Sequence, residues 1–316
     1  MIDGYGRKIN YLRVSVTKRC NLNCTYCGAE CERAEELTKD EILKLVRAFA
    51  TLGITKVRLT GGEPLVRSDI CEIAEGIARM EGIKKLALTT NGVLLAKYAG
   101  RLKEAGVNAV NISLDTTDKE QYKKITGFDL LDKVYEGIDK AERVGLSPIR
   151  LNAVLIRGQN DDQTEKLISI ARDRKIDVRF IELMPFSDAG DNERLVIKGE
   201  EILAAFPYLK AVEADNKKGF EKSVARYYTA EGFKGRIGFI TPVSDKFCGE
   251  CNRIRLLSDG KVKPCLGCER VFDLKEYLDD EALLLKKAEE AILAKPMEHQ
   301  FSCGYGHSHG LNKIGG

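Results

Sequence analysis

The sequence predicts an α/β fold in which a partial (β/α)6 barrel is followed by a C-terminal α+β region. Six apolar runs rich in β-branched residues alternate with segments of helical periodicity up to Leu183, and the alternation stops there. Such alternation implies a parallel sheet with crossover helices. Six units are two fewer than a closed eight-fold barrel contains, so an open barrel is expected.

The strands and helices of the first region can be read in order. The first helix is the clearest, because Thr38 and Glu41 fit a capping box and an apolar face follows them. Catalytic groups of such folds usually lie where strands end, at the carboxyl edge of the sheet. The six predicted strands are YLRVSVT, KVRLTG, KKLALTTN, AVNISLD, PIRLNAVLI and DVRFIEL.

The second region has a different pattern. We expect one domain over residues 1–183 and another over residues 184–316. After a polar linker, the second begins with a short helix around Glu201 to Phe206, followed by antiparallel strands in SVARYYTA, GRIGFIT and NRIRLLSDGKVKPC, the last turning at Asp259-Gly260. A further helix is predicted over roughly residues 272 to 294, before a glycine-rich end.

Composition excludes several classes of protein. The chain has 316 residues, 43% hydrophobic and 31% charged, which is enough to bury a large core without disulfides. It contains neither a signal-peptide pattern nor an apolar stretch long enough for a membrane helix, so we expect a cytoplasmic protein. With 51 basic and 48 acidic residues, no nucleic-acid partner is expected. In a reducing compartment, ten clustered cysteines indicate metal ligands.

Four of these cysteines lie in the stretch CNLNCTYCGAEC, residues 20–31. Structural zinc sites usually use paired C-x2-C elements, whereas thiolates in one short loop suit an iron–sulfur cluster, although zinc stays open as an alternative. The triplet resembles that of the radical S-adenosylmethionine (SAM) superfamily, whose 4Fe–4S cluster binds three protein thiolates and SAM. The resemblance implies that Cys20, Cys24 and Cys27 are ligands, that Tyr26 contributes to the cofactor site, and that Cys31 is surplus.

The ends of later strands carry further matches to this superfamily. LTGGEP, residues 59–64, has two glycines that allow close approach of a ligand to the backbone. Read alone, each of these segments is a turn or a helix cap. By the resemblance, Glu63 meets the ammonium group of SAM, and the other cofactor-binding candidates are Gly61, Gly62, Thr90, Asn91, Ser113 and Asn152.

The second half of the chain narrows the resemblance from the superfamily to one family within it. Cys248, Cys251 and Cys265 form C-x2-C-x13-C, and the run CNRIR follows the second of them. This pattern is similar to that of the GTP 3′,8-cyclases of molybdenum cofactor biosynthesis (MoaA), in which three thiolates hold a second 4Fe–4S cluster that binds guanine. The final Gly315 and Gly316 resemble a tail of that family that reaches the active site.

Arginines supply candidate contacts for a triphosphate. Guanidinium groups are planar, bidentate donors that stay charged, although a lone arginine is more often a surface charge. Arg253 and Arg255 alternate along a strand and should point to one face. Either is a candidate catalytic partner of the guanine ring, and the sequence does not choose between them. By match to the family, the candidate GTP contacts are Arg13, Arg67, Arg179, Arg253 and Arg255.

The resemblance also implies a reaction. One electron cleaves SAM at the first cluster, and the 5′-deoxyadenosyl radical takes hydrogen from ribose carbon 3′ of GTP. The ribosyl radical attacks guanine carbon 8, and the resulting radical is reduced and protonated. The product is 3′,8-cyclo-7,8-dihydro-GTP, in the first step of molybdopterin biosynthesis, so the enzyme is a lyase. The implied partners are a flavodoxin or ferredoxin-type electron donor and the downstream cyclic pyranopterin monophosphate synthase, and a homodimer is left open.

Cys268 leads to two alternatives. It extends the second motif to C-x2-C-x13-C-x2-C and could supply a fourth ligand to the second cluster. A fully ligated cluster would relay electrons, as in radical SAM enzymes that modify peptides. The same spacing is close to a zinc ribbon, a structural or nucleic-acid-binding module. Neither alternative requires the arginine run or the terminal glycines.

Overall fold

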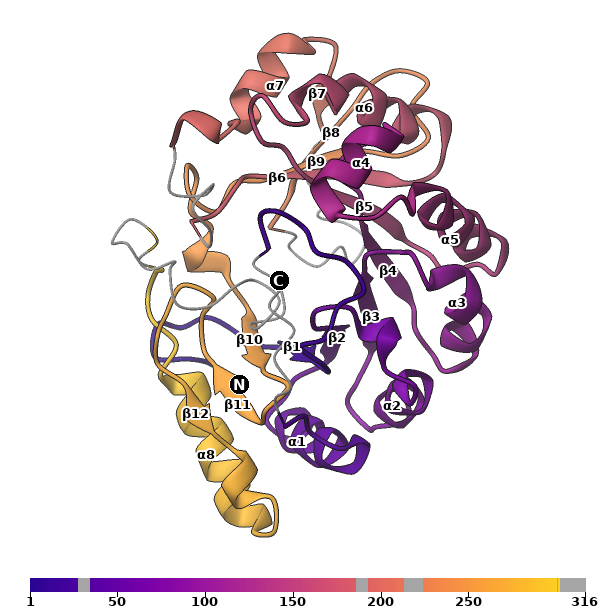
Figure 1. The fold of residues 1–316 in the computed structure, drawn as a ribbon. Helices are drawn as coiled ribbons and strands as arrows, with labels where there is room; N and C mark the ends of the chain where they lie inside the picture. Colours follow the sequence, from indigo (N-terminus) through magenta and orange to yellow (C-terminus); the bar gives the residue numbers. More distant parts are fainter. Residues whose placement is uncertain (28–34, 186–192, 213–223, 300, 302–316) are drawn as a thin grey trace.

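One twelve-stranded sheet organises the part of the chain that this computed structural model describes, residues 1–27, 35–185, 193–212, 224–299 and 301 (Figure 1). The strand order is β12-β11-β10-β1-β2-β3-β4-β5-β6-β9-β8-β7. Its first six strands in the sequence are parallel, in register with their neighbours, and confirm the predicted open barrel. They are β1 (Tyr11–Ser15), β2 (Lys56–Thr60), β3 (Lys85–Thr90), β4 (Ala109–Ser113), β5 (Ile149–Val154) and β6 (Asp177–Ile181).

Helices connect these strands along the outside of the curved sheet (Figure 1). The predicted capping box at the start of α1 is present, with the Thr38 amide donating to Glu41 at 2.7 Å and the Glu41 amide donating to the Thr38 hydroxyl at 3.2 Å. None of the described helices is both long and apolar enough to cross a membrane. They are α1 (Lys39–Thr51), α2 (Ile70–Ala78), α3 (Leu95–Glu104), α4 (Lys119–Thr126), α5 (Leu131–Arg143) and α6 (Thr164–Asp173), with short 3-10 turns η1 (Pro64–Val66) and η2 (Asp161–Gln163).

The C-terminal region adds strands to both sides of the same sheet, beside β1 and beside β6. β9 pairs parallel with β6, and β10 pairs parallel with β1, while the hairpin neighbours β8 and β11 are antiparallel as predicted. Within the described residues, this region therefore extends the barrel at both sides, which local turn signals could not predict. Its elements are η3 (Glu193–Leu195), α7 (Gly199–Ala205), β7 (Lys210–Ala211), β8 (Arg226–Thr229), β9 (Ile237–Ile240), η4 (Cys248–Glu250), β10 (Arg253–Leu256), β11 (Lys261–Lys263), β12 (Phe272–Asp273), η5 (Lys275–Tyr277) and α8 (Glu281–Leu293).

The last helix begins later than the sequence predicts. The prediction of helix from about residue 272 is wrong over its first part, where β12 and η5 lie. Asp280 fixes the true start, because its carboxylate accepts a hydrogen bond from the Leu283 amide at 3.0 Å. The short helix predicted near Glu201 is confirmed as α7.

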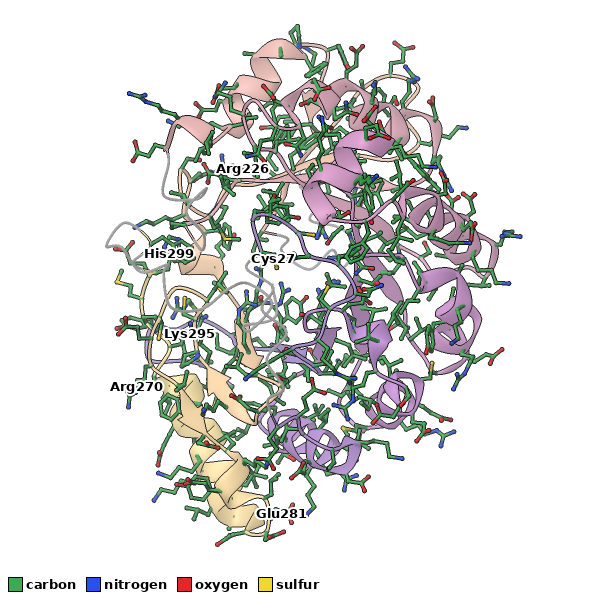
Figure 2. The ribbon with its side chains drawn as sticks, viewed as in Figure 1. Cys27, Arg226, Arg270, Glu281, Lys295 and His299 are labelled. Carbon is green, nitrogen blue, oxygen red and sulfur yellow. The ribbon has the colours of Figure 1, made fainter. Side chains whose placement is uncertain are left out.

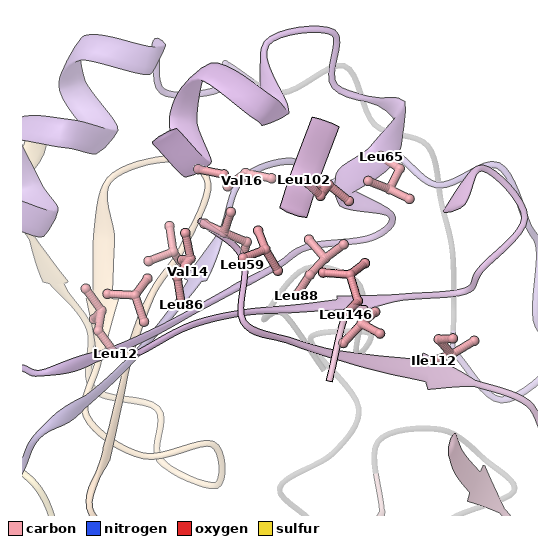
Figure 3. Close-up of a cluster of buried hydrophobic side chains, with 14 of the residues drawn as sticks. Leu12, Val14, Val16, Leu59, Leu65, Leu86, Leu88, Leu102, Ile112 and Leu146 are labelled. Atoms are coloured by element: carbon pink, nitrogen blue, oxygen red, sulfur yellow. The ribbon is translucent and has the colours of Figure 1, made fainter. Parts of the chain in front are cut away.

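The apolar core lies between the sheet and the helices (Figure 3). Leu12 and Val14 of β1 are fully buried in it, beside leucines of β2 and β3. Burial of each such side chain contributes roughly 1.5–3 kcal/mol to folding. Because successive side chains of a strand point to opposite faces, Tyr11 and Arg13 lie on the inner face of the sheet instead. The inner face therefore holds the charged groups that the core cannot accept.

Candidate active site

The first cysteine loop follows the carboxyl end of β1. Cys20, Cys24 and Cys27 are half-buried and form no disulfide, and the Cys27 amide donates to the Cys24 carbonyl at 3.0 Å. Cys20 Sγ accepts from the Leu22 amide at 3.4 Å. Figure 2 draws Cys27 near the centre of the view, with Lys295 and His299 of the C-terminal region to its left. Three thiols on one short irregular segment fit a cluster whose irons each bind one thiolate.

The loop is fastened to the rest of the barrel by backbone hydrogen bonds. The Asn23 amide donates to the Thr126 carbonyl and the Thr25 amide to the Ile125 carbonyl, both at 2.9 Å, at the end of α4. Cys31, which the sequence leaves surplus, lies outside the described residues. The thiol spacing is thus held by contacts distant in sequence.

The two glycines after β2 make room for this loop. A Cβ on Gly61 would lie 2.4 Å from the Thr17 carbonyl oxygen, and one on Gly62 would lie 2.4 Å from that of Arg19. The Gly62 amide donates to that same Thr17 oxygen at 2.9 Å. The chain's own backbone, at the start of the cysteine loop, therefore occupies the space that the absent side chains leave. Close approach of a ligand at these glycines stays a prediction.

Glu63 is completely buried between the ends of β2 and β3. Its carboxylate accepts hydrogen bonds from the Leu65 amide at 2.9 Å, the Thr90 hydroxyl at 2.8 Å and the Asn91 amide at 2.6 Å. Burial raises the pKa of Glu63 to about 7, against the lowering effect of these three bonds. Since a carboxylate has about four acceptor positions, one remains for a cationic ligand.

A cavity of about 30 Å³ lies beside the cysteine loop. The Tyr26 hydroxyl at its wall donates to the Asp115 carboxylate at 2.5 Å. Burial raises the pKa of Asp115 to about 6, although Tyr26 and the Val154 amide hydrogen-bond to it. Sequence reasoning passed over Asp115, since the segment SLD was read only through Ser113. The lining residues are Leu22, Cys24, Tyr26, Asn91, Ser113, Asp115, Thr116, Tyr122, Ile125 and Thr126.

The thiols next to this cavity hold their protons firmly. Burial raises the pKa of Cys20 and of Cys24, and the charges of Asp115 and the neighbouring thiols add to the effect at Cys24. Asn91 connects the loop to β3, because its side-chain amide donates to Asn21 at 2.7 Å and approaches Cys20 Sγ at 3.9 Å. A metal must therefore displace these protons on binding.

Cations occupy one level of the sheet across four neighbouring strands. Arg13 is in register with Arg255 of β10 on one side and with Arg58 of β2 on the other, and Arg255 is in register with Lys263 of β11. Directly paired residues point to the same face. We call Lys263, Arg255, Arg13 and Arg58 the cation row. The predicted shared face of Arg253 and Arg255 is confirmed by β10, whereas Arg58 and Lys263 were missed.

Burial lowers the pKa values of two arginines in the cation row. It lowers the pKa of Arg13 well below the usual range, and the neighbouring Arg255 adds to the effect. It lowers the pKa of Arg255 itself to about 10, helped by Arg253. Like charges this close are costly unless an anion neutralises them. The row therefore favours a strongly negative ligand.

Arg179 and Asn152 lie on the inner face further along the sheet. Asn152 Oδ1 accepts from Arg179 Nε at 3.0 Å and from Nη2 at 2.7 Å. Burial lowers the pKa of Arg179 to about 10, and the charges of Arg150 and Arg58 also lower it. The sequence assigned Asn152 and Arg179 to different ligands, but the structure joins them in one pair.

Arg67 is predicted to contact GTP, but in the structure most of its donors bind groups of the chain itself. Its Nη1 donates to the Val16 carbonyl at 2.7 Å and the Leu37 carbonyl at 2.8 Å, and its Nε and Nη2 donate to Asp69 at 2.7 and 2.9 Å. Four of the five donors of the guanidinium are therefore used within the chain. Arg67 fastens the segments on either side of the cysteine loop.

The second thiol set is Cys248, Cys251 and Cys265. It lies at the amino ends of the strands, which we call the amino edge, opposite the carboxyl edge that holds the first loop. Cys248 and Cys251 precede the amino end of β10, and β11 runs back antiparallel to bring Cys265 to the same edge. Because β10 is parallel to β1, this edge is the one where β1 begins. The cation row lies between the two thiol sets along the strands. Placement at the amino edge was not expected, because functional groups of such folds usually lie at the carboxyl edge.

Two cations, the buried Lys295 and the half-buried Arg253, lie close to Cys251 of the second thiol set. Lys295 is 2% exposed, and its ammonium donates to the Arg253 carbonyl at 2.8 Å and the Pro264 carbonyl at 3.0 Å. Burial alone would raise the pKa of Cys251, but Lys295 and Arg253 outweigh it and lower that pKa. Cys268 differs, since burial raises its pKa and its thiol contacts the Arg270 carbonyl at 3.6 Å.

Comparison with known proteins identifies the family. The family model for the Radical SAM superfamily matches residues 14–171, and that for Molybdenum Cofactor Synthesis C matches residues 176–301. The chain is 45% identical over 325 aligned positions to the GTP 3′,8-cyclase of Alkaliphilus oremlandii, covering 100% of both chains. It is 41% identical to that of Listeria monocytogenes, covering 95% of this chain and 92% of the relative. The chain belongs to the GTP 3′,8-cyclase family.

Membership of this family, within the radical SAM superfamily, makes the protein a radical SAM enzyme with SAM and a 4Fe–4S cluster as cofactors. Solved structures show the same fold at low sequence identity. SuiB of Streptococcus suis bound to S-adenosylmethionine has a TM-score of 0.63 and 17% identity, over 86% of this chain and 65% of that one. The anSMEcpe enzyme with bound AdoMet has a TM-score of 0.59 and 18% identity, over 90% and 83%.

Proposed function

We propose that this chain is a GTP 3′,8-cyclase. The observation that carries the proposal is the cation row on the inner face, between a thiol set at each edge of the sheet. When bound, SAM and its cluster would supply a 5′-deoxyadenosyl radical that removes a hydrogen atom from ribose carbon 3′ of GTP. The ribose would then bond to guanine carbon 8, and one electron from the donor and one proton would complete the product. The product is 3′,8-cyclo-7,8-dihydro-GTP, the first intermediate of molybdopterin biosynthesis. The protein's own contribution is to place the two ligands and exclude water.

The carboxyl edge would hold SAM. The remaining acceptor position of Glu63 suits the ammonium group of SAM, and the buried carboxyl of Asp115 adds negative charge beside the cavity. The hydrogen bonds of Thr90 and Asn91 to Glu63 orient its carboxylate. In this proposal Cys20, Cys24 and Cys27 bind the first cluster, and the cofactor site comprises Tyr26, Gly61, Gly62, Glu63, Thr90, Asn91, Ser113 and Asn152.

The amino edge would hold a second 4Fe–4S cluster through Cys248, Cys251 and Cys265. A cluster with three thiolates carries net negative charge, and the cations around Cys251 favour such a group in a buried place. The guanine ring would meet this cluster's open iron. Arg253 or Arg255 would then be the catalytic partner of the ring, since both face the space between the edges.

The triphosphate would bind along the inner face. Arg13, Arg255 and Arg179 contribute buried guanidinium groups there, and Arg253 adds a half-buried one; bidentate pairing with phosphate oxygens would relieve their mutual repulsion. Arg58 joins this proposed set, and Arg67 has a weaker claim because the chain uses most of its donors. Contacts from Gly315 and Gly316 stay part of the proposal, although both lie outside the described residues.

The domain division and the wider setting are also proposals. A division into 1–183 and 184–316 is supported by the end of the βα alternation at β6, although β9 and β10 join the same sheet. We further propose a flavodoxin or ferredoxin-type electron donor, a cyclic pyranopterin monophosphate synthase that receives the product, and a cytoplasmic location.

Isotope transfer tests the function. The anaerobically reconstituted protein is given SAM, a reductant and GTP deuterated at ribose carbon 3′. The proposal expects deuterium in the 5′-deoxyadenosine that forms. It also expects a product with the mass of unlabelled GTP, because the transferred deuterium atom is replaced by one electron from the reductant and one proton from solvent. Turnover of SAM without deuterium transfer, under conditions in which both clusters are present, would contradict the proposal and favour the peptide-modifying alternative, in which Cys268 closes the second cluster.

A further inference from the structure

Tyr11 is the first residue of β1 and lies on the inner face, where its backbone amide donates to the Asn252 carbonyl at 3.2 Å. It is 8% exposed, and its phenolic oxygen accepts a hydrogen bond from Arg58 Nε at 2.5 Å. Arg58 is itself held in place, since its Nη1 donates to the Leu88 carbonyl at 3.1 Å and to the Thr89 hydroxyl at 3.2 Å. The phenol is therefore fixed against a guanidinium that cannot easily turn away.

Cations face Tyr11 from each strand that packs beside it. On β2, the ammonium of Lys56 lies 4.5 Å from the centre of the phenol ring. On β10, Arg253 is the direct register partner of Tyr11, and on β1 itself Arg13 follows two residues later on the same face. A phenol that touches one cation and faces three more sits in a strongly positive field.

This field changes the chemistry of the phenol. Burial alone would raise the pKa of Tyr11, but Arg58, Arg13, Lys56 and Arg253 together lower it to about 7. The effect is mutual. The charge of Tyr11 acts to raise the pKa values of Arg13, Arg255 and Arg179, opposing the burial that lowers them. A phenolate at this position would thus neutralise part of the row.

We propose that Tyr11 is a positioning residue for the substrate, whose phenolate is the counter-ion of the cation row in the nucleotide-free enzyme and takes a proton from solvent when a nucleoside triphosphate replaces it. This inference rests on the proposed function for the identity of the anion. The phenolate keeps the guanidinium groups gathered and oriented before the substrate arrives. Once the phosphates neutralise the same cations, the phenolate loses its stabilising field and becomes a neutral phenol.

Binding of GTP is then linked to proton uptake. Above the pKa of the free phenol, each bound nucleotide takes up close to one proton, so the affinity falls as the pH rises. Between pH 7.5 and 8.5 the association constant should fall roughly fivefold to tenfold. This range lies above roughly pH 6, near which a terminal phosphate takes its last proton. A tyrosine with only a packing role would give no such slope.

Calorimetry of the reconstituted holoenzyme tests the linkage. Titrations with GTP in two buffers of different ionisation enthalpy count the protons taken up at each pH. The wild type and a Tyr135→Phe control on α5 should show the uptake and the pH slope, and Tyr11→Phe should lose both while still binding GTP. Tyr11→Phe with the uptake and slope of the wild type would overturn the proposal.

A second variant leaves the phenol in place. Lys56→Gln removes one cation, so the pKa of Tyr11 should rise and the pH slope should move to higher pH. An unmoved slope in a variant that folds and binds GTP would contradict the proposal even if Tyr11→Phe fails to assemble its clusters.

Titration without nucleotide separates this inference from the proposed function. In the reconstituted holoenzyme without nucleotide, the near-ultraviolet phenolate absorbance of the wild type minus that of Tyr11→Phe should rise near neutral pH. A difference signal that rises only near pH 10, the ordinary value for tyrosine, would reject the inference whatever ligand the row binds. Failure of GTP to bind, with the neutral titration present, would instead reject the substrate assignment.

Discussion

The two edges of the sheet hold thiol sets in opposite electrostatic surroundings. At the carboxyl edge, the buried carboxyls of Glu63 and Asp115 lie beside the first loop, with pKa values raised by burial to about 7 and about 6. At the amino edge, Lys295 and Arg253 are next to the second set, and they lower the pKa of Cys251. The same kind of ligand, a cysteine, is thus presented to one acidic and one basic environment.

This difference indicates how two ligands could be sorted. SAM carries positive charge on its sulfonium and ammonium groups, whereas GTP carries several negative charges. Complementary charge favours each ligand at one edge and repels it from the other. β1 has five residues, so the two edges lie roughly 16 Å apart along it. A nucleotide is long enough to bridge much of that distance.

Of the single substitutions, removal of a first-loop thiol should most strongly alter one edge while leaving the other intact. In Cys24→Ala we expect loss of the first cluster and of all turnover, because the iron there loses a ligand, while the second cluster stays. Iron content and EPR measure both. The matched control is Cys71→Ala in α2, a thiol buried in the core, which should keep both clusters at a cost of about 1 kcal/mol in the free energy of unfolding. Loss of both signals in Cys24→Ala would contradict the separation of the edges.

A methyl group at Gly62 should disrupt the carboxyl edge and leave the amino edge intact. In Gly62→Ala the new Cβ meets the Arg19 carbonyl oxygen, a backbone atom that cannot step aside, and we expect a loss of roughly 3 kcal/mol together with poor loading of the first cluster. Gly100→Ala in α3 is the control, because nothing lies within 4 Å of its new Cβ and the change should stabilise the helix by about 0.5–1 kcal/mol. Thermal unfolding and iron analysis measure both variants. A harmless Gly62→Ala would show that the loop does not depend on this contact.

A change in the cation row should weaken GTP binding and leave SAM binding unchanged. Arg255→Lys keeps the charge but loses the bidentate fork, so we expect a loss of roughly 1.5–3 kcal/mol, or about tenfold to a hundredfold in GTP affinity. Arg174→Lys makes the same exchange at a distant ion pair with Asp139 and should change neither affinity. Equal weakening of both ligands by Arg255→Lys would mean that the edges are not independent.

The smallest expected effect is a pH dependence at the carboxyl edge. A cation bound beside Glu63 requires the carboxylate, so SAM affinity should rise with pH up to about 7, the pKa of the free carboxyl, and Glu63→Gln should flatten this rise. Measurement below about pH 7.7 avoids titration of the amino group of SAM. In the ligand-free protein the sign is reversed, because the folded pKa exceeds the ordinary value of 4.5. Stability from this group falls as the pH rises from 4.5 to about 7. An unchanged slope in Glu63→Gln would assign the dependence to another group.

The sequence predicts the parts of this arrangement that depend on local pattern. The strand and helix alternation, the capping box at Thr38 and the shared face of Arg253 and Arg255 all follow from residue periodicity, and the structure confirms them. The cysteine motifs predict both thiol sets, because ligand spacing in a loop is also a local property; their role as ligands stays a prediction.

The parts that depend on long-range pairing could not be predicted in this way. Packing decides that β10 pairs with β1. This pairing places the second thiol set at the amino edge and brings Arg255 beside Arg13. Arg58 carries no signal in the sequence, and only the register aligns it with the cation row. Arg67 followed a motif, but its donors are taken by carbonyls that only the fold brings near.

The most direct test of the two-edge account is EPR of the reduced, reconstituted protein with SAM, with GTP and with neither. Spectra of Cys24→Ala and Cys251→Ala assign each signal to one edge. The account predicts that SAM perturbs only the signal lost in Cys24→Ala and that GTP perturbs only the signal lost in Cys251→Ala. A second signal that ignores GTP, but changes when Cys268 is replaced by alanine, would contradict the account and make the amino-edge cluster an electron relay.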